Sequence, residues 1–410
     1  MNQGPLSGIR VIEAGRFASA PSCATILADW GAEVIKLEPP GGDPARGPGS
    51  VDPANPHSPA NAAQRVNPRF DVHNRTRRSV ALDLSVPVGR GVARRLITAA
   101  DVFVTNLRQK ALTRLELDST TLRAAAPQLV YAQVTGYGDA DEENRRSYDH
   151  GAFWSYSGMA ALFRDSAGTP PQPAGGMGDR ASGSALAGAV CAALFARQRT
   201  GRGEHVSVSL LSTAMWLMAS DAADALRTPA PARGNDRLSA PIPTVNCFRC
   251  ADGRWLWLQS MLPERDWDAL LTALDARWLD DDPRFSGGDG RLLAQGRAAL
   301  TEALDEIFRQ RGAAEWCRRL SCAGLTVAEV RELSEAVRDP LVLGSGAIRQ
   351  VRHDGGAYAT VSSPCSFASA PLAEPRPAPV VGADTEQVLA ELGITGSELT
   401  ELRASGAVAR

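Results

Sequence analysis

The chain has 410 residues, of which 44% are hydrophobic and 22% charged, and its formal net charge is −2. This length exceeds one small core and favours two domains, and the composition excludes a disordered chain. The near-neutral charge gives no reason to expect a nucleic acid or an acidic membrane surface as a partner.

The N-terminal segment Met1–Gly8 has no apolar signal region, and no apolar run reaches the length of a membrane span. The seven cysteines are an odd number without disulfide-like spacing. Cys247 and Cys250 form a lone CxxC, whereas a zinc site needs four ligands, and the histidines lack the spacing of a metal site. We therefore expect a cytoplasmic, reduced protein without a bound metal.

Short apolar runs alternate with helical stretches in the first half. The expected strands are Ile9–Glu13, Glu33–Glu38, Arg78–Leu84, Asp101–Thr105 and Leu129–Thr135, and the expected helices are Ser19–Trp30, with Ser19 as N-cap, and Val88–Ala100. This alternation predicts parallel βαβ units and hence an α/β fold with a doubly wound, mostly parallel sheet. The long Gly/Pro/Asn-rich loop at Pro39–Pro68 is of a kind that is usually functional or ordered by a partner.

The second half changes in character. The run Ser207–Leu211 and a Trp/Met-rich helix near Ala214–Leu226 precede a Pro/Ala/Arg-rich linker at Thr228–Pro243. A hairpin is then expected at Thr244–Cys250 with Trp255–Gln259, followed by amphipathic helices at Asp266–Leu274, Arg291–Gln310 and Ala313–Ala323. Two further strands are expected at Ile348–His353 and Ala357–Val361, and two closing helices at Thr385–Leu392 and Ser397–Ala404.

The most informative stretch is Gly175–Asp179, a run of glycines that ends in one carboxylate before a helix of small residues. An Asp at a helix start faces free N–H groups and the positive end of the helix dipole, which keep it ionised and in place. Two interpretations are open. Asp179 is either an ordinary N-cap, the commoner role, or a carboxylate nucleophile with an oxyanion site beside it.

Other candidate residues are weaker. Glu38 ends the second strand, where an acidic residue binds ribose in dinucleotide folds, but Glu13–Ser19 lacks the GxGxxG glycines that a pyrophosphate requires. The polar trio Tyr148–His150 precedes an aromatic run, and His150 is either a base or a structural residue. Arginines are frequent near the expected strand ends and suit a phosphorylated handle as a group, although each alone is typical of a solvated surface.

The order of several blocks resembles the family III CoA-transferases, the CaiB/BaiF superfamily, over nearly the whole length. The blocks are Pro5–Val11, Ala28–Pro40, Arg78–Leu84, Ala100–Asn106, Gly136–Gly138, Gly178–Asp179, Thr200–Gly203 and Gly382–Leu389. Asn67–Phe70 with Asn74, and Val104–Leu112, are most similar to the branch that handles 2-hydroxyacyl and arylacyl CoA esters.

The resemblance implies that Asp179 is the catalytic aspartate. It would attack an acyl-CoA thioester to form a mixed anhydride, and the released thiolate would convert this to an aspartyl-CoA thioester. An incoming carboxylic acid would then exchange through a second anhydride and leave with CoA. The backbone amides of Gly176 to Gly178, or those of the helix start, are the candidates for oxyanion contacts. Coenzyme A enters as an acyl-CoA substrate, without a metal.

The resemblance also assigns a set of CoA-binding positions. They are Arg16, Phe17, Ala18, Leu82, Asn106, Leu107, Arg108, Ala111, Arg114, Arg146 and Tyr148. Pro39 and Thr135 stand where some members have basic residues, so phosphate contacts are expected to be redistributed to Arg46, Arg108 or Arg146. The glycine-rich flap of formyl-CoA transferases has no counterpart, which argues against a formyl/oxalate substrate pair.

Two alternatives stay open. The superfamily includes α-methylacyl-CoA racemases, whose catalytic His is replaced by Tyr148 here, a poor base at neutral pH; His150 lies two residues further on. A CoA-binding protein without chemistry is the other alternative.

The resemblance further implies a homodimer of interlocked chains with a discontinuous large domain. We expect a Rossmann-like CoA-binding domain at 1–200 and 330–410, a linker and crossing helix at 201–243, and a small α+β domain at 244–329.

Overall fold

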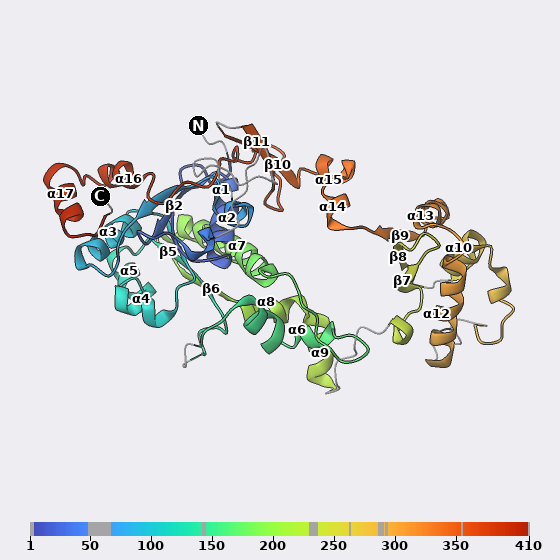
Figure 1. Cartoon of the computed structure of the whole chain (residues 1–410). Coiled ribbons are helices and arrows are strands. Elements are labelled where there is room, and N and C mark those ends of the chain that lie inside the picture. The colour runs from blue at the N-terminus through green and yellow to red at the C-terminus, as the bar shows by residue number, and fades with distance from the viewer. Residues whose placement is uncertain are drawn as a thin grey trace. The chain divides into compact units, whose positions relative to one another are not determined.

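The computed structural model describes residues 4–47, 67–141, 145–228, 237–261, 264–285, 291, 294–353 and 356–408 (Figure 1). The chain forms two compact units. The large unit comprises Met1–Ala160, Gln172–Ala230 and Pro340–Arg410, and the small unit comprises Ala161–Pro171 and Pro231–Asp339. These bounds differ from the expected ones: 201–230 lies in the large unit, and 161–171 and 330–339 lie in the small unit.

A six-stranded parallel sheet forms the centre of the large unit, in the order β3-β2-β1-β4-β5-β6. Its strands are β1 (Arg10–Ala14), β2 (Glu33–Glu38), β3 (Arg78–Ala81), β4 (Val102–Thr105), β5 (Val130–Thr135) and β6 (His205–Ser209). The predicted α/β class with a parallel sheet is confirmed. The segment expected as a linker from residue 201 instead supplies β6, because the alternating Val206 and Val208 pack against the core beside β5.

Alternate residues of each strand face opposite sides of this sheet, and helices cover both sides. Val11, Val34 and Val104 pack with α1 (Ser19–Asp29) and α7 (Met177–Thr200). Ile12 and Ile35 face the other side. The helices there are α3 (Pro87–Thr98), α5 (Ser119–Ala125), α16 (Thr385–Glu391) and α17 (Gly396–Ala404), so the C-terminal helices return to the sheet of the first half.

Several elements of the large unit were not expected from the sequence. They include α2 (Pro68–Asn74), α4 (Gln109–Leu115), α5 and a π-helical segment, η3 (Asp149–Tyr156). Two short helices, α8 (Leu210–Leu217) and α9 (Ala219–Arg227), replace the single helix expected there. The expected strands β10 (Ile348–His353) and β11 (Gly356–Val361) form an antiparallel pair.

The small unit has an antiparallel sheet of β7 (Val245–Arg249), β8 (Trp255–Gln259) and β9 (Thr326–Val330). The expected hairpin is β7–β8, and β9 adds to it. Helices α10 (Glu264–Leu274), α12 (Ala294–Phe308) and α13 (Ala313–Cys322) complete one apolar core with this sheet.

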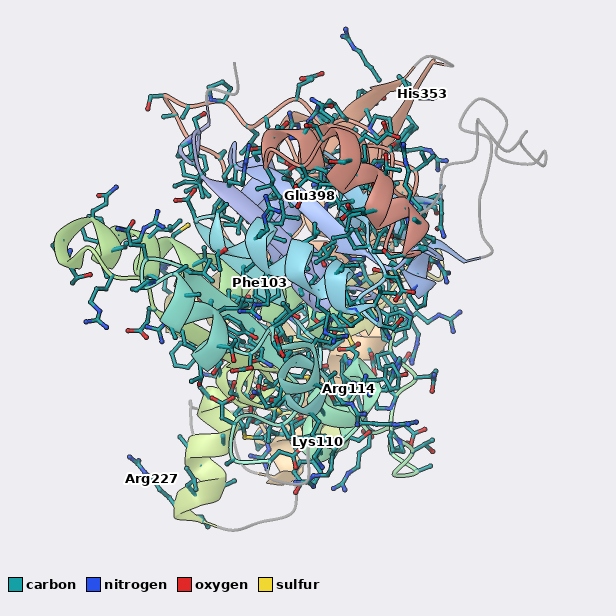
Figure 2. All side chains as sticks on the ribbon, turned by 90° about the vertical axis from the view of Figure 1, so that its left-hand side faces the viewer. Phe103, Lys110, Arg114, Arg227, His353 and Glu398 are labelled. Atoms are coloured by element: carbon teal, nitrogen blue, oxygen red, sulfur yellow. The ribbon has the colours of Figure 1, made fainter. Side chains whose placement is uncertain are left out.

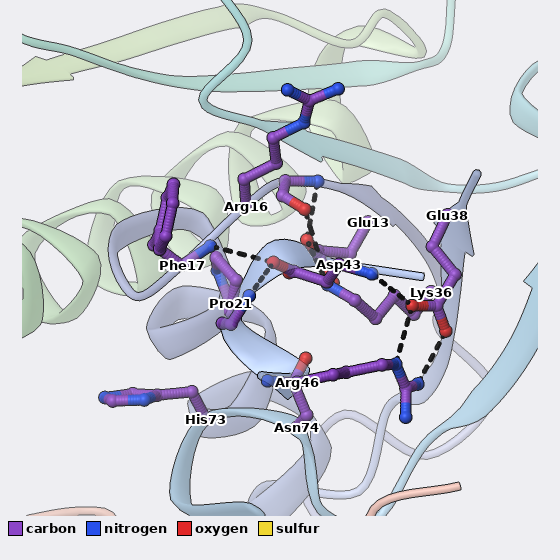
Figure 3. Close-up of polar contacts among 12 residues, drawn as sticks. Glu13, Arg16, Phe17, Pro21, Lys36, Glu38, Asp43, Arg46, His73 and Asn74 are labelled. Carbon is purple, nitrogen blue, oxygen red and sulfur yellow. Dashed lines mark hydrogen bonds and ion pairs between the residues drawn. The ribbon is translucent and has the colours of Figure 1, made fainter. Parts of the chain in front are cut away.

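Beneath the loop after β1 lies a buried ion cluster, formed by Glu13, Lys36 and Asp43 (Figure 3) together with Arg77. Lys36 Nζ lies 3.2 Å from Glu13 Oε2 and 2.9 Å from Asp43 Oδ2, and it donates to the carbonyl of Gly15 at 3.3 Å. Arg77 donates to Glu13 Oε2 at 2.8 Å and also holds the hydroxyl of Thr25. The cluster therefore ties β1, β2, α1 and the loop at residue 15 to one another.

Lys36→Met tests how much this cluster stabilises the fold. The substitution leaves two buried carboxylates with one fewer cation, and removing one partner of a buried ion pair costs about 3–5 kcal/mol. We expect the free energy of unfolding in urea to fall by about that amount. Arg94→Gln is the control, because it breaks only the exposed Arg94–Glu116 pair and should cost about 0–1 kcal/mol. Equal effects of the two substitutions would contradict the structural role of the cluster.

Candidate active site

The strand order reverses between β1 and β4, and ligands of doubly wound sheets bind at the carboxyl ends of the strands at such a point. The loops after Ala14 and Thr105 meet there. Asn106 accepts a hydrogen bond from the Arg16 amide at 2.9 Å and donates to the Arg16 carbonyl at 2.8 Å. One side chain thus fixes two of the predicted CoA-binding positions against each other.

Phe17 has a backbone φ of +60°, which is rare for a bulky residue. Its ring is half exposed and lies 6.3 Å from that of Tyr148, in an edge-to-face arrangement. Backbone strain of this kind persists only where the surrounding contacts enforce it, and such strained residues are concentrated at functional sites. The structure therefore places two predicted CoA-binding aromatic residues side by side at an exposed surface.

The other predicted CoA-binding residues follow the strand ends. Ala18 precedes α1, and Leu107, Arg108, Ala111 and Arg114 follow Asn106 along the loop and α4, where Figure 2 shows Arg114 beside Lys110. The side chains of Arg16, Arg108, Arg114 and Arg146 are exposed, and that of Arg16 points away from the buried ion cluster (Figure 3). Leu82 is fully buried in the core and its N–H donates to the carbonyl of Glu38 at 2.9 Å, so the structure does not bring this predicted position to the surface.

Arg46 differs from expectation. Its guanidinium forms two hydrogen bonds with Glu38, at 2.9 and 2.6 Å, and stacks over the ring of Phe70. Glu38 also accepts from the hydroxyl of Ser79 at 2.6 Å. Arg46 is therefore not a phosphate ligand in this arrangement, and Glu38 is not a ribose ligand.

Asp179 lies in the first turn of α7 but is not the N-cap. The cap is Gly176, with φ of +83°, a conformation that glycine adopts without strain. The hydroxyl of Ser19 donates a hydrogen bond to the Asp179 carboxylate and accepts one from the Asn106 amide at 2.9 Å. Ser19 was expected as the N-cap of α1; it is instead the first helical residue and connects Asp179 with the loops at the switch point.

Asp149 is a second carboxylate beside Asp179, at the start of η3. It is buried, and its Oδ2 accepts the N–H of Gly176 at 2.7 Å. Its Oδ1 has no hydrogen-bond partner within the described residues and lies 2.4 Å from where a Cβ at Gly178 would stand. The same Cβ would stand 2.2 Å from Phe153 Cγ, so only glycine fits between Asp149, Phe153 and the start of α7.

The pKa of Asp179 is raised to about 6. The largest cause is burial, and the charge of Asp149 adds to it, while Arg180, His150 and the Ser19 hydrogen bond oppose it. We expected the helix start to keep this carboxylate ionised; desolvation and the neighbouring carboxylate outweigh that effect. With a pKa of about 6 the carboxylate is still mostly charged at pH 7. Asp179 is thus a poorly solvated anion, as suits a nucleophile.

Arg180 and His150 lie near this carboxylate, and His73 contacts Arg180. The guanidinium of Arg180 lies 3.4 Å from Nε2 of the buried His73, on α2. His150 is exposed, and its Nε2 lies 3.2 Å from the carbonyl of Pro173. The sequence indicated Asp149 and His150 only as members of a polar trio. No local pattern indicated His73 or Arg180, because they are 107 residues apart.

In the part of the chain that the structure describes, no group of three His, Cys, Asp or Glu side chains could hold a metal ion, and no helix is both long and apolar enough to cross a membrane. Cys247 and Cys250 are both free thiols, with Cys250 buried after the end of β7.

Asp179→Asn should stabilise the folded protein at high pH. A raised pKa means that folding penalises the charged form, so wild type carries this penalty above about pH 6 and loses it as the pH falls towards the unfolded value of 3.8. We expect the melting temperature of the variant to exceed that of wild type at pH 8 and to approach it near pH 4. The exposed Asp281→Asn should show no such trend. A variant that is less stable at pH 8 than at pH 4, relative to wild type, would contradict the raised pKa.

Known proteins resemble the chain in sequence and in fold. The pattern of CoA-transferase family III matches residues 6–385. The (R)-2-hydroxy-4-methylpentanoate CoA-transferase of Clostridioides difficile is 28% identical over 405 residues, which cover 98% of this chain and 99% of that protein. The cinnamoyl-CoA:phenyllactate CoA-transferase of Clostridium sporogenes is 29% identical over 412 residues, with 98% and 96% covered.

A solved structure of a CAIB/BAIF family protein from Brucella suis superposes with a TM-score of 0.82 at 26% identity, covering 95% of this chain and all of that one. The family pattern spans most of the chain, and the similarity of fold extends over nearly its whole length. The chain therefore belongs to CoA-transferase family III.

Proposed function

We propose that the protein moves CoA from an acyl-CoA thioester to a carboxylic acid through a covalent intermediate on Asp179. The observation that carries the proposal is the position of this carboxylate. It is desolvated, it stands at the start of α7, and Ser19 and Asn106 join it to the loop after β1. A carboxylate is a poor nucleophile for direct attack on a thioester. A covalent intermediate on the enzyme divides the reaction into steps with lower barriers.

Each step forms and breaks one bond. An Asp179 oxygen attacks the thioester carbonyl, the C–S bond breaks, and a mixed anhydride and CoA thiolate result. The thiolate attacks the aspartyl carbonyl, which releases the first acid and leaves an aspartyl-CoA thioester. The second acid attacks that carbonyl and displaces the thiolate, which then takes the new acyl group and frees Asp179. No net proton or electron is required.

Backbone amides at the start of α7 are the candidates for stabilising the oxyanions. The N–H groups of the first helical turn, from Met177 to Asp179, have no acceptor one turn before them in the helix. The N–H of Gly176 donates to Asp149, so Gly176 does not serve as a donor here. We assign the role of Gly176 to forming the turn, and that of Gly178 to leaving space for Asp149 and Phe153.

For the CoA moiety we propose the loops at the switch point. Arg16, Phe17 and Ala18 from the first loop, and Asn106 to Arg114 from the second, surround the carboxyl ends of β1 and β4. Arg146 and Tyr148 come from the segment before η3, and Tyr148 contacts Phe17. For the acyl group we propose 2-hydroxy or arylalkyl acids, the class named for the two relatives from clostridia.

We also infer a homodimer, interlocked as the resemblance implies. Large apolar side chains of α8 and α9 are exposed in the single chain: Trp216 by 78%, Leu217 by 58% and Leu226 by 86%. Exposed apolar patches mark interaction sites, and a second copy would cover this one.

Trapping of the intermediate tests the proposed chemistry. With an acyl-CoA donor, hydroxylamine should convert Asp179 to its hydroxamate, which peptide mass spectrometry locates. Asp179→Asn should abolish both the hydroxamate and CoA transfer, by a factor of about 10³ or more, while CoA still binds. Asp281→Asn should retain wild-type transfer.

The outcomes separate the alternatives. Deuterium uptake at the α-carbon of the acyl-CoA, without exchange of CoA between acids, would replace transfer by a racemase reaction in which His150 acts near Asp179. CoA binding without trapping or exchange, across a panel of acyl-CoA donors and acids, would indicate a binding protein without chemistry.

Sedimentation tests the dimer. Trp216→Glu places a charge in the exposed apolar surface of α8 and should shift the protein towards the monomer at micromolar concentration. Val88→Glu is the control, since Val88 is 48% exposed on α3. A wild-type monomer, or a Trp216→Glu dimer as tight as wild type, would contradict the assignment of this surface.

A further inference from the structure

The Arg180 side chain folds back across the glycine turn before α7. Its NH2 donates to the carbonyl of Gly175 at 3.4 Å, and its NH1 lies 3.2 Å from where a Cβ at Gly176 would stand. Arg180 directly follows Asp179 in the first turn of the helix. The guanidinium therefore stays at the end of α7 that carries the nucleophile.

His73 holds this guanidinium as a neutral acceptor. The Nδ1 of His73 lies 3.0 Å from the carbonyl of Arg69, which requires a proton on Nδ1 and leaves the Nε2 lone pair to face Arg180. Burial lowers the pKa of His73 to about 4, and the charge of Arg180 adds to this. The imidazole thus orients Arg180 without supplying a negative charge.

Among the described residues Arg180 forms no close ion pair, although its charge acts on the neighbouring Asp179. Within the described ranges no Asp or Glu lies at ion-pair distance from it, and its two contacts are long and neutral. Nearby arginines are different, since Arg75 pairs with Asp29 and Arg77 with Glu13 at 2.7 and 2.8 Å. An exposed and oriented guanidinium is suited to bind an anion.

The proposed reaction brings a second anion to this place. The acid acceptor carries its charge on the carboxylate that must approach the uncharged aspartyl-CoA carbonyl, and the carboxylate of Asp149 is buried beside that position. Two carboxylates that lie close together repel each other strongly in a partly desolvated site. A cation that contacts the incoming carboxylate offsets this repulsion without acting on the uncharged thioester.

We propose that Arg180 binds the carboxylate of the acid substrate beside Asp179, and that His73 is the positioning residue that orients its guanidinium. The inference rests on the proposed function and adds the recognition of the acid to it. One carboxylate oxygen contacts the guanidinium while the other attacks the aspartyl-CoA carbonyl, so the bonds formed and broken remain those of the steps above.

The test compares acid with acyl-CoA in steady-state transfer. The probes are isotopically labelled 2-hydroxy-4-methylpentanoate and the unlabelled CoA ester of the same acid, so that each transfer is seen as label entering the CoA ester. Arg180→Gln should raise the KM for the acid about 10- to 100-fold, the size expected for one charge-assisted hydrogen bond. The KM for the acyl-CoA should change less than threefold, and hydroxylamine trapping of Asp179 should persist. Arg199→Gln, on the exposed last turn of the same helix, should match wild type.

A second readout is independent of turnover. The amide of the same acid has its shape without its charge. Wild type should therefore bind the free acid more tightly than the amide in an equilibrium binding measurement, and Arg180→Gln should remove that preference. His73→Gln keeps a neutral acceptor and should retain it, whereas His73→Leu should lose most of it. Acyl-CoA binding by each variant checks that it is folded.

The two proposals can fail separately. If wild type gives no trapped Asp179 adduct and no transfer, the proposed function is wrong and this inference fails with it. If wild type is active and Arg180→Gln leaves the KM of the acid and the preference for acid over amide unchanged, only the role of Arg180 is wrong. An equal rise in both KM values would likewise overturn it.

Discussion

The charge of Lys36, buried between Glu13 and Asp43, is the constraint on which the site depends. Burying four ionisable groups is costly unless each is paired. In this cluster each side chain pairs with an opposite charge and also forms a hydrogen bond with a backbone group. Lys36 fixes the carbonyl of Gly15, and Asp43 accepts the amide of Phe17 at 3.4 Å. The strained backbone of Phe17 is therefore held by a carboxylate that the buried cluster itself fixes in place.

From this cluster, contacts lead to the nucleophile along two routes. On one, Asn106 joins the loop after β1 to Ser19, and Ser19 donates to Asp179. On the other, Arg77 donates to the carbonyl of His73 at 2.6 Å, and the ring of His73 faces Arg180. Both routes end in the first turn of α7, so the packing of α1 and α2 sets the surroundings of Asp179.

The local sequence pattern is enough to predict much of the fold and one residue of the candidate site, Asp179. Strands such as Glu33–Glu38 and Ile348–His353 were predicted with their observed bounds, because each is a compact apolar or alternating run. The sequence pattern places β6 in the expected linker and crossing helix at 201–243, because the five residues of β6 are only partly apolar and follow a helix that ends in glycine. Asp179 was found from its glycines. The direction of its pKa shift was not, because it depends on Asp149, 30 residues earlier, and on burial that no local pattern encodes.

The hydrogen bond from Ser19 has a thermodynamic consequence. Ser19 stabilises the charged form of Asp179. The hydroxyl of Ser19 is itself held by a hydrogen bond from Asn106, which also forms a hydrogen bond with the loop proposed to receive CoA. If occupancy of that loop alters the Ser19 contact, it alters the proton affinity of Asp179. Linkage then requires that protonation of Asp179 alters the affinity for the ligand by the same factor. Proton uptake or release on binding, detectable as a dependence of the binding enthalpy on the buffer, would be the macroscopic sign of one hydroxyl shared between recognition and reactivity.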